Sequence, residues 1–137
     1  MNEKITVYLD MDGTIADLYS IKNWLPRLRN SDPTIFLECD PIITEETLFK
    51  TFPEELYDIK ILSMTPKGAS KEYCKKVAKQ KDFWLNTYFP RLTKRIYKTY
   101  GHNKNLKNSW KAILIDDSAP IRKSWNGKAL DPATLWD

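Results

Sequence analysis

Short apolar runs alternate with helical patterns along this chain. Runs rich in apolar and β-branched residues, each bounded by polar or turn-forming residues, predict strands at residues 5–9, 59–62, 95–97, 112–115 and 128–130. Strands that alternate with helices in this way are typical of a parallel sheet with helices on both faces. We therefore expect an α/β fold.

The clearest helical pattern lies between the second and third strands. Ser70 is a suitable N-cap residue, and Pro90 ends the region. Lysines fill one face of this helix, and apolar residues recur at helical spacing on the other face: Tyr73, Cys74, Val77, Trp84 and Leu85. Shorter helices are predicted at residues 103–110 and 118–125.

Residues 17–58 depart from this alternation. Ile21, Trp24 and Leu28 have helical spacing, although Pro26 requires any helix there to start just before it. Thr44 can cap a second short helix. We interpret residues 17–58 as an insertion of small helices and turns between the first two strands, too small to fold alone. Its aromatic side chains could cover a site, but packing is the better interpretation for any one of them.

Composition places limits on the class of protein. A chain of 137 residues with 42% hydrophobic content predicts one globular domain, residues 1–137. No apolar stretch is long enough to cross a bilayer, and the first residues do not resemble a secretory signal. Cys39 and Cys74 have no metal-binding or redox spacing, so we expect reduced, structural cysteines in a cytoplasmic protein without a membrane partner.

The chain is modestly basic, with a net charge of +4. Its clustered lysines are better explained as solvated helix faces than as a positive field that attracts phosphorylated substrates. Clustered lysine alone does not establish nucleic-acid binding.

The sequence Asp-Met-Asp-Gly-Thr at positions 10–14 directly follows the first strand. Asp and Gly are depleted in strands, so the strand is expected to end here. In extended backbone residues i and i+2 face the same way, so Asp10 and Asp12 should point together, with Thr14 close behind. Such like charges are relieved by a divalent cation or a shared proton. We therefore expect the chemistry here.

Polar groups also follow other predicted strands. Ser63 ends the second strand, residues 116–117 are two aspartates that end the fourth, and Lys104 opens the helix before the fourth. In an open parallel sheet, ligands bind at the carboxyl ends of the strands, so these groups are expected on one rim. Thr65 is an alternative to Ser63, and Lys107 is an alternative to Lys104.

These residue types suit phosphoryl transfer. Asp10 is the candidate nucleophile, because a carboxylate can attack phosphorus and form an acyl phosphate. Asp12 would protonate the leaving alkoxide and later deprotonate the attacking water. Asp10, the Asp12 carbonyl and Asp116 would bind Mg2+, which masks the negative charge of the substrate. Asp117 would contact the ion through water or support its ligands.

Four further residues are predicted to bind the phosphate. Ser63 would donate a hydrogen bond to a phosphoryl oxygen, and Lys104 would neutralise charge on the transferred group. Thr14 and Met64, which lie in the same two strand-end segments, complete the expected phosphate-binding set.

In order and spacing these segments resemble the four motifs of the haloacid dehalogenase superfamily, whose members are mostly magnesium-dependent phosphatases. The resemblance spans residues 5–130. It implies a Rossmann-like fold in which Asp10 is the nucleophile and Asp12 the acid/base. Ser63, Lys104 and Asp116 would fill the second, third and fourth motifs. The insertion is similar to the small helical caps that follow the first motif in this superfamily.

Within the superfamily the chain looks most like the 5'(3')-deoxyribonucleotidases and their relatives. The supporting features are Thr-Pro at 65–66, Phe-Trp-Leu at 83–85 and Trp-Asn-Gly at 125–127. This resemblance implies hydrolysis of a deoxynucleoside monophosphate through an aspartyl-phosphate. A short cap leaves an open entrance, so nucleic-acid ends or sugar phosphates are alternative substrates. A non-catalytic nucleotide- or phosphate-binding protein is a third possibility, and the chain is compatible with a monomer or a homodimer.

Overall fold

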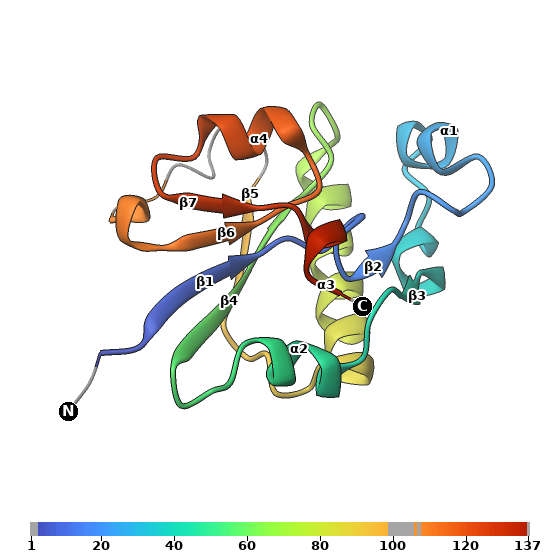
Figure 1. Cartoon of the computed structure of the whole chain (residues 1–137). Coiled ribbons are helices and arrows are strands. Elements are labelled where there is room, and N and C mark those ends of the chain that lie inside the picture. The colour runs from blue at the N-terminus through green and yellow to red at the C-terminus, as the bar shows by residue number, and fades with distance from the viewer. Residues whose placement is uncertain (1–2, 99–105, 107, 137) are drawn as a thin grey trace.

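The computed structural model describes residues 3–98, 106 and 108–136. Within these residues a sheet of five parallel strands has the order β5-β4-β1-β6-β7 (Figure 1). The strands are β1 (Ile5–Leu9), β4 (Tyr57–Met64), β5 (Arg95–Lys98), β6 (Ile113–Ile115) and β7 (Lys128–Leu130). The α/β prediction is confirmed, and the second strand is longer than expected.

Helices pack on both faces of this sheet. On one face α3 (Lys71–Tyr88) buries Val77, Trp84 and Leu85 against β1 and β4. On the other face the short helix α4 (Ala119–Ser124) leads into Trp125, which packs against Tyr8 of β1 and its neighbours. A five-stranded parallel sheet with both faces covered is consistent with a Rossmann-like fold.

The strand order fixes where a ligand can bind. β1 is central and pairs with β4 on one side and with β6 on the other, so that Leu9 lies opposite both Ile61 and Ile115. The chain order of the strands reverses at β1, and open α/β sheets bind ligands in the crevice outside the strand ends at such a point. The residues that follow β1 and β6 therefore occupy the position expected of a site.

Between β1 and β4 the chain forms only short elements. They are β2 (Ala16–Asp17), α1 (Trp24–Arg29), the 3-10 turn η1 (Ile35–Glu38), β3 (Asp40–Pro41) and α2 (Glu45–Thr51). Pro26 lies in the first turn of α1, where the missing N–H costs little. The Thr44 hydroxyl caps α2 by accepting a hydrogen bond of 3.1 Å from the Thr47 N–H, as predicted. In Figure 1 α1 and η1 lie to the right of the sheet, beyond α3.

The cap of α3 agrees with the sequence, whereas Ser118 before α4 makes no side-chain cap hydrogen bond. The Ser70 hydroxyl accepts a hydrogen bond of 3.1 Å from the Tyr73 N–H at the start of α3. Half of the helix predicted at residues 103–110, namely 103–105 and 107, lies outside the described residues. The described part contains the 3-10 turn η3 (Ser109–Lys111), and a second turn, η4 (Pro132–Thr134), follows β7.

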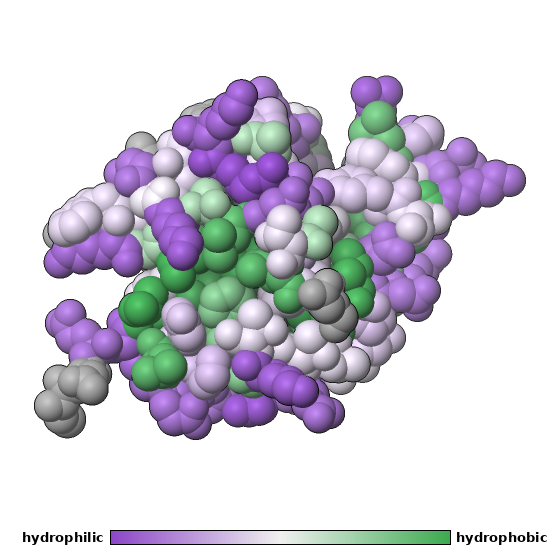
Figure 2. Space-filling model, in the orientation of Figure 1, coloured by the Kyte–Doolittle hydropathy of each residue, from purple (hydrophilic) through white to green (hydrophobic). Residues whose placement is uncertain are grey.

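Three further observations concern the surface, the cysteines and the helices. Figure 2 shows apolar side chains over β1 and neighbouring strands on the face toward the viewer. Ile5 of β1 and Leu56, just before β4, are exposed. Cys39 and Cys74 are free thiols, in agreement with the expectation from their spacing. In the part of the chain that the structure describes, we find no helix with the length and apolarity to cross a membrane.

Candidate active site

Three aspartates converge where β1 and β6 end. One carboxylate oxygen from each of Asp10, Asp116 and Asp117 lies within 4.8 Å of the other two. The topology causes this, because Asp10 and Asp116 directly follow adjacent parallel strands, and the Asp10 N–H donates to the Ile115 carbonyl at 3.0 Å. Asp10 and Asp116 are buried, with 7% and 1% of their surface exposed. The structure thus brings together carboxylates that are distant in the sequence.

Asp117 is one of the three grouped carboxylates, whereas from the sequence we expect it to contact the ion through water or to support its ligands. Its carboxylate is one of the three that could bind an ion directly, rather than one that acts only through water. Gly13 creates the necessary space: its φ of 81° is in the left-handed region, and a Cβ there would collide with Asp117 Oδ2 and with the Tyr19 ring. The glycine of the first motif is therefore required by the neighbouring carboxylate.

Neighbouring groups orient the two buried carboxylates. Asp116 Oδ1 accepts a hydrogen bond of 2.9 Å from the Ser118 N–H, and its main-chain oxygen accepts one of 2.9 Å from Arg122 of α4. The Thr14 hydroxyl donates to Asp10 Oδ2 at 3.1 Å. Thr14 is fully buried and is not among the residues that line the pocket described below, and its hydroxyl contacts Asp10; its predicted contact with phosphate stays a prediction.

Lys81 is a functional candidate that the sequence reasoning missed. The sequence pattern predicts that the lysines of α3 lie on a solvated face. For Lys81 this prediction is wrong, because its side chain is fully buried. Its Nζ donates to Asp12 Oδ2 at 2.9 Å, to Ser63 Oγ at 2.7 Å and to the Met64 carbonyl at 2.6 Å. The signal was present in the spacing, because Lys81 lies four residues after Val77 and three before Trp84, on the apolar face.

The two carboxylate oxygens of Asp12 have different surroundings. Oδ2 is bound by Lys81, whereas Oδ1 is buried and has no hydrogen-bond partner among the described residues. A buried carboxylate oxygen without a partner is costly, so this atom is a favourable acceptor or proton carrier for a bound ligand. The residue that the sequence assigns to acid/base work is thus held at one oxygen and available at the other.

The residues at the end of β4 and just after it differ in their access to the pocket. Ser63 is fully buried, accepts its hydrogen bond from Lys81 and does not line the pocket. Met64 and Thr65 do line it. Of the two candidates for the second motif, Thr65 is the one that lines the pocket, whereas Ser63 Oγ accepts from Lys81; which of them would bind a phosphate stays a prediction. The candidates for the third motif, Lys104 and Lys107, lie outside the described residues.

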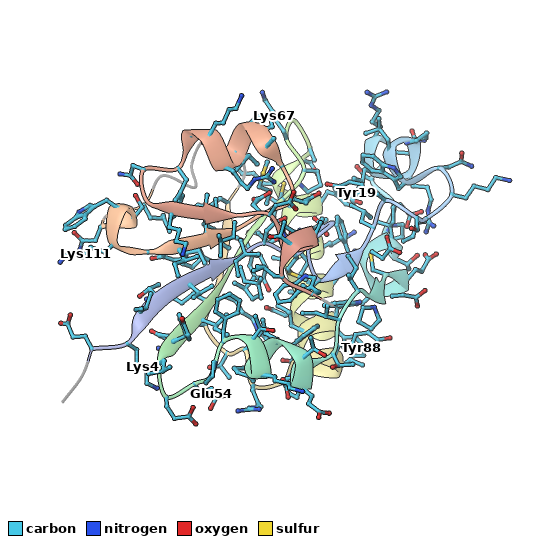
Figure 3. All side chains as sticks on the ribbon, viewed as in Figure 1. Lys4, Tyr19, Glu54, Lys67, Tyr88 and Lys111 are labelled. Carbon is cyan, nitrogen blue, oxygen red and sulfur yellow. The ribbon has the colours of Figure 1, made fainter. Side chains whose placement is uncertain are left out.

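A pocket of about 190 Å³ opens directly over the aspartates. Its floor is acidic and its walls come from the insertion, the loop after β4 and the start of α4; they include Leu18, Tyr19, Trp24, Leu28, Phe36, Met64, Thr65, Pro66, Lys67, Ser118 and Ile121. Asp10, Asp12, Asp116 and Asp117 all line it. Tyr19 and Lys67 both line this pocket; in Figure 3 Lys67 lies at the upper edge of the molecule and Tyr19 lies below and to the right of it.

The aspartates create a strongly negative field in the pocket. Burial raises the pKa of the Tyr19 phenol well above its usual value, and the charges of Asp117, Asp12, Asp10 and Asp116 raise it further. The Tyr19 ring makes an edge contact with Trp24, with the ring centres 4.8 Å apart. The aromatic pair therefore forms a wall close to the acidic floor.

The donor set fits a hard divalent cation. Mg2+ and Mn2+ prefer carboxylate and carbonyl oxygens, and three carboxylates at these separations can share one ion. Compared with known proteins, the chain matches no protein-family model and no curated protein. The function is therefore inferred from the geometry of this pocket and from the sequence motifs.

Proposed function

We propose that this protein is a divalent-cation-dependent phosphomonoesterase that works through an aspartyl-phosphate. The observation that carries the proposal is the convergence of Asp10, Asp116 and Asp117 at the ends of two adjacent strands, in one pocket with Asp12. Phosphoryl transfer requires a nucleophile, an acid/base and a means of masking negative charge on the phosphate. The pocket holds residue types suited to each requirement.

Asp10, Asp116 and Asp117 would hold Mg2+, and the main-chain carbonyl of Asp12 is a further candidate ligand from the sequence. When bound, the ion would mask the charge of the phosphate and favour attack by an anion. Without it, four carboxylates would repel a phosphate ester from this pocket. The acidic floor therefore favours a substrate that binds together with a cation.

In the proposed first step a carboxylate oxygen of Asp10 attacks phosphorus, and the bond from phosphorus to the ester oxygen breaks. Asp12 gives its proton to the departing alkoxide, which leaves as an alcohol. In the second step water attacks the phosphorus of the aspartyl-phosphate while Asp12 takes a proton from it. Inorganic phosphate is released, and Asp10 and Asp12 return to their starting states.

Lys81 has a positioning role in this proposal. All three of its hydrogen bonds go to protein atoms, so its charge is directed at Asp12 and the end of β4 rather than into the pocket. Holding Asp12 Oδ2 leaves Oδ1 to carry the proton. A fixed orientation of an acid/base group contributes to rate because it removes the need for reorganisation in the transition state.

The sequence resemblance narrows the expected substrate. The motifs resemble those of the haloacid dehalogenase superfamily, and the flanking residues look most like the 5'(3')-deoxyribonucleotidases. We therefore propose a deoxynucleoside monophosphate as the first substrate to test. The aromatic wall of Tyr19 and Trp24 supports a leaving group with apolar surface.

The test is phosphate release from a panel of phosphate esters with and without Mg2+, for the wild type and for Asp10→Asn. The variant should lower kcat by about a thousandfold or more, because an amide is a very poor nucleophile. The fold should persist, since the amide has the same shape and its oxygen can still accept from Thr14.

Asp40→Asn is the matched control, because Asp40 is exposed and lies outside the pocket but loses the same charge. It should retain wild-type turnover. Wild-type turnover in Asp10→Asn, with the circular dichroism spectrum unchanged, would show that another group is the nucleophile.

A further inference from the structure

A second hollow adjoins the catalytic pocket. It has a volume of about 500 Å³ and lies between α1 and the loop that leads from β4 into α3. Leu28, Pro66 and Lys67 line both hollows, so they form one continuous groove from the aspartates outward. A ligand that is anchored at the aspartates can therefore extend directly into this second hollow.

The volumes indicate that part of a substrate lies in the second hollow. Pockets for small organic ligands usually measure about 300–1,000 Å³. The catalytic pocket, at about 190 Å³, falls below that range, whereas the combined groove falls within it. A phosphate and a small leaving group fit over the aspartates, and a larger leaving group has to continue past Lys67.

The charged residues that line the second hollow, Arg29 and Lys67, are both cations, whereas the floor of the first hollow is acidic; Lys67 lines both. Ser31 and Ser70 add hydroxyl groups to the second hollow. No carboxylate is found among the described residues that line it. Asp32 follows the lining residue Ser31 in the sequence but is not itself a lining residue. Its carboxylate forms an ion pair of 2.7 Å with Arg27. A positive hollow beside a cation-dependent site favours a ligand with a second negative group.

From this arrangement we infer that the second hollow, with Arg29 and Lys67, binds a second phosphate of the substrate. The preferred substrate is then a nucleoside that carries a phosphate at each end, either as a free bisphosphate or as the phosphorylated end of an oligonucleotide. This inference rests on the proposed phosphatase function. Guanidinium and ammonium groups bind phosphate by charge-assisted hydrogen bonds, and the hydroxyls of Ser31 and Ser70 can add further donors.

The experiment compares kcat/KM for four substrates with Mg2+: p-nitrophenyl phosphate, a deoxynucleoside 5'-monophosphate, the 3',5'-bisphosphate and a short 5'-phosphorylated oligonucleotide. We expect the bisphosphate to exceed the monophosphate by about tenfold, mainly through KM. Arg29→Gln should reduce that ratio by about fivefold and leave p-nitrophenyl phosphate unchanged. Lys22→Gln, an exposed lysine before α1 and outside both hollows, is the charge-matched control.

Equal kcat/KM values for the monophosphate and the bisphosphate, or a ratio that Arg29→Gln does not change, would overturn the inference. Use of the bisphosphate but not the oligonucleotide identifies a mononucleotide substrate. Use of both, with a steeper salt dependence for the oligonucleotide, identifies a nucleic-acid end. If no ester is hydrolysed, the proposed function fails separately. Calorimetric titration with the bisphosphate then decides, since equal affinities for the wild type and Arg29→Gln would exclude a phosphate site.

Discussion

The ammonium group of Lys81 connects three parts of the site, because it donates to Asp12, to Ser63 and to the Met64 carbonyl. Its side chain is fully buried, and the Asp12 carboxylate is 18% exposed. It also lies 4.7 Å from the centre of the Phe36 ring in the insertion. A charge in this position is stable only while its partners remain, and they in turn depend on it.

Lys81→Met should therefore affect both stability and activity. We expect the free energy of unfolding to fall by about 3 kcal/mol, because the Asp12 carboxylate and the Met64 carbonyl lose their donor. The kcat for phosphate release should fall by about a hundredfold with a smaller change in KM, since Asp12 loses its fixed orientation. Urea denaturation and steady-state kinetics measure the two effects.

Lys79→Met is the control, since Lys79 is exposed on the same helix. It should change stability by less than about 0.5 kcal/mol. A double-mutant cycle with Asp12→Asn should give a clear coupling energy between the two positions. Additive effects in that cycle, together with normal turnover in Lys81→Met, would contradict the positioning role.

Gly13 permits a comparison that separates backbone strain from damage to the site. Both Gly13 and Gly68 have positive φ values, 81° and 79°, so alanine at either position costs about 1–2 kcal/mol of backbone strain. Only at Gly13 would the new Cβ collide with Asp117; at Gly68 there is open space. Gly13→Ala should weaken Mn2+ binding at least about tenfold by calorimetry, whereas Gly68→Ala should bind Mn2+ like the wild type. Equal Mn2+ affinity in the two variants would mean that Asp117 is not a ligand.

At the level of single residues, the sequence indicated Asp10, Asp12 and Asp116 because they follow strands. It misplaced Lys81, because lysine on a helix is usually solvated and the partners of its ammonium group are far away in the sequence. Thr14 was expected to contact phosphate, but whether its hydroxyl faces outward or toward Asp10 depends on the turn at Gly13. The hydroxyl orientation of Thr14 is a matter of this local turn. The helical spacing of Lys81 already put it on the apolar face of α3, and only its distant partners could not be read from the sequence.

Among the elements, α3 connects the insertion to the sheet. Three of its side chains bond to main-chain groups of the insertion: Gln80 accepts from the Phe36 N–H at 3.2 Å, Trp84 donates to the Cys39 carbonyl at 2.7 Å, and Tyr73 donates to the Asp32 carbonyl at 2.7 Å. These bonds satisfy main-chain polar groups in a segment that has only short elements of its own. The insertion wall of the pocket is therefore held in position by α3.

A second set of contacts joins α1 to the residues that follow it in the insertion. Arg27 of α1 donates to Asp32 at 2.7 Å and to Glu38 of η1 at 3.0 Å. The hydrogen bond from Arg27, assisted by the Thr34 N–H, lowers the pKa of Asp32 to about 2, and Arg27 also lowers the pKa of Glu38. A carboxyl group with a lowered pKa in the folded state stabilises the fold above its unfolded pKa. That contribution is lost as the pH falls through the folded value.

We therefore expect the stability advantage of the wild type over Arg27→Gln to be present at pH 5 and to diminish between about pH 4 and pH 2. Urea denaturation across this range measures the difference. Lys22→Gln, which removes an exposed cation just before α1, should show a smaller dependence on pH. A wild-type advantage that stays constant from pH 5 to pH 2 would show that the Arg27 contacts do not stabilise the fold.

The sequence predicted regular elements better than it predicted the insertion. The helix starts at Ser70 and Thr44 have clear caps, and the strands have short apolar runs, so local signals were sufficient. β4 extends to Tyr57 and Met64 because pairing with β1 and β5 lengthens it beyond its apolar centre. The path of the insertion depends on contacts with α3 that are 41 to 45 positions apart in the chain, and no local pattern specifies them.

At the scale of the whole molecule, the parallel order of the sheet concentrates negative charge at one point. Asp10 and Asp116 are buried, and with Asp117 they lie close together although the chain as a whole carries a net charge of +4. Repulsion between buried carboxylates opposes folding, and a cation that binds only the folded state offsets it. Folding and ion binding are therefore expected to be coupled.

This coupling predicts that Mg2+ stabilises the wild type and that Asp116→Asn removes most of the effect. At a Mg2+ concentration about 100 times the dissociation constant, the free energy of unfolding should rise by about 2.7 kcal/mol. In Asp116→Asn the amide oxygen can still accept from the Ser118 N–H, so the fold should persist, and without Mg2+ its stability should equal or exceed that of the wild type. Thermal unfolding with Mg2+, and with choline chloride at the same ionic strength, measures the specific gain.

Asp40→Asn should keep the full gain, because it removes a charge outside the pocket. A gain in Asp116→Asn as large as in the wild type would show that the ion binds elsewhere, and the carboxylates would then need another explanation.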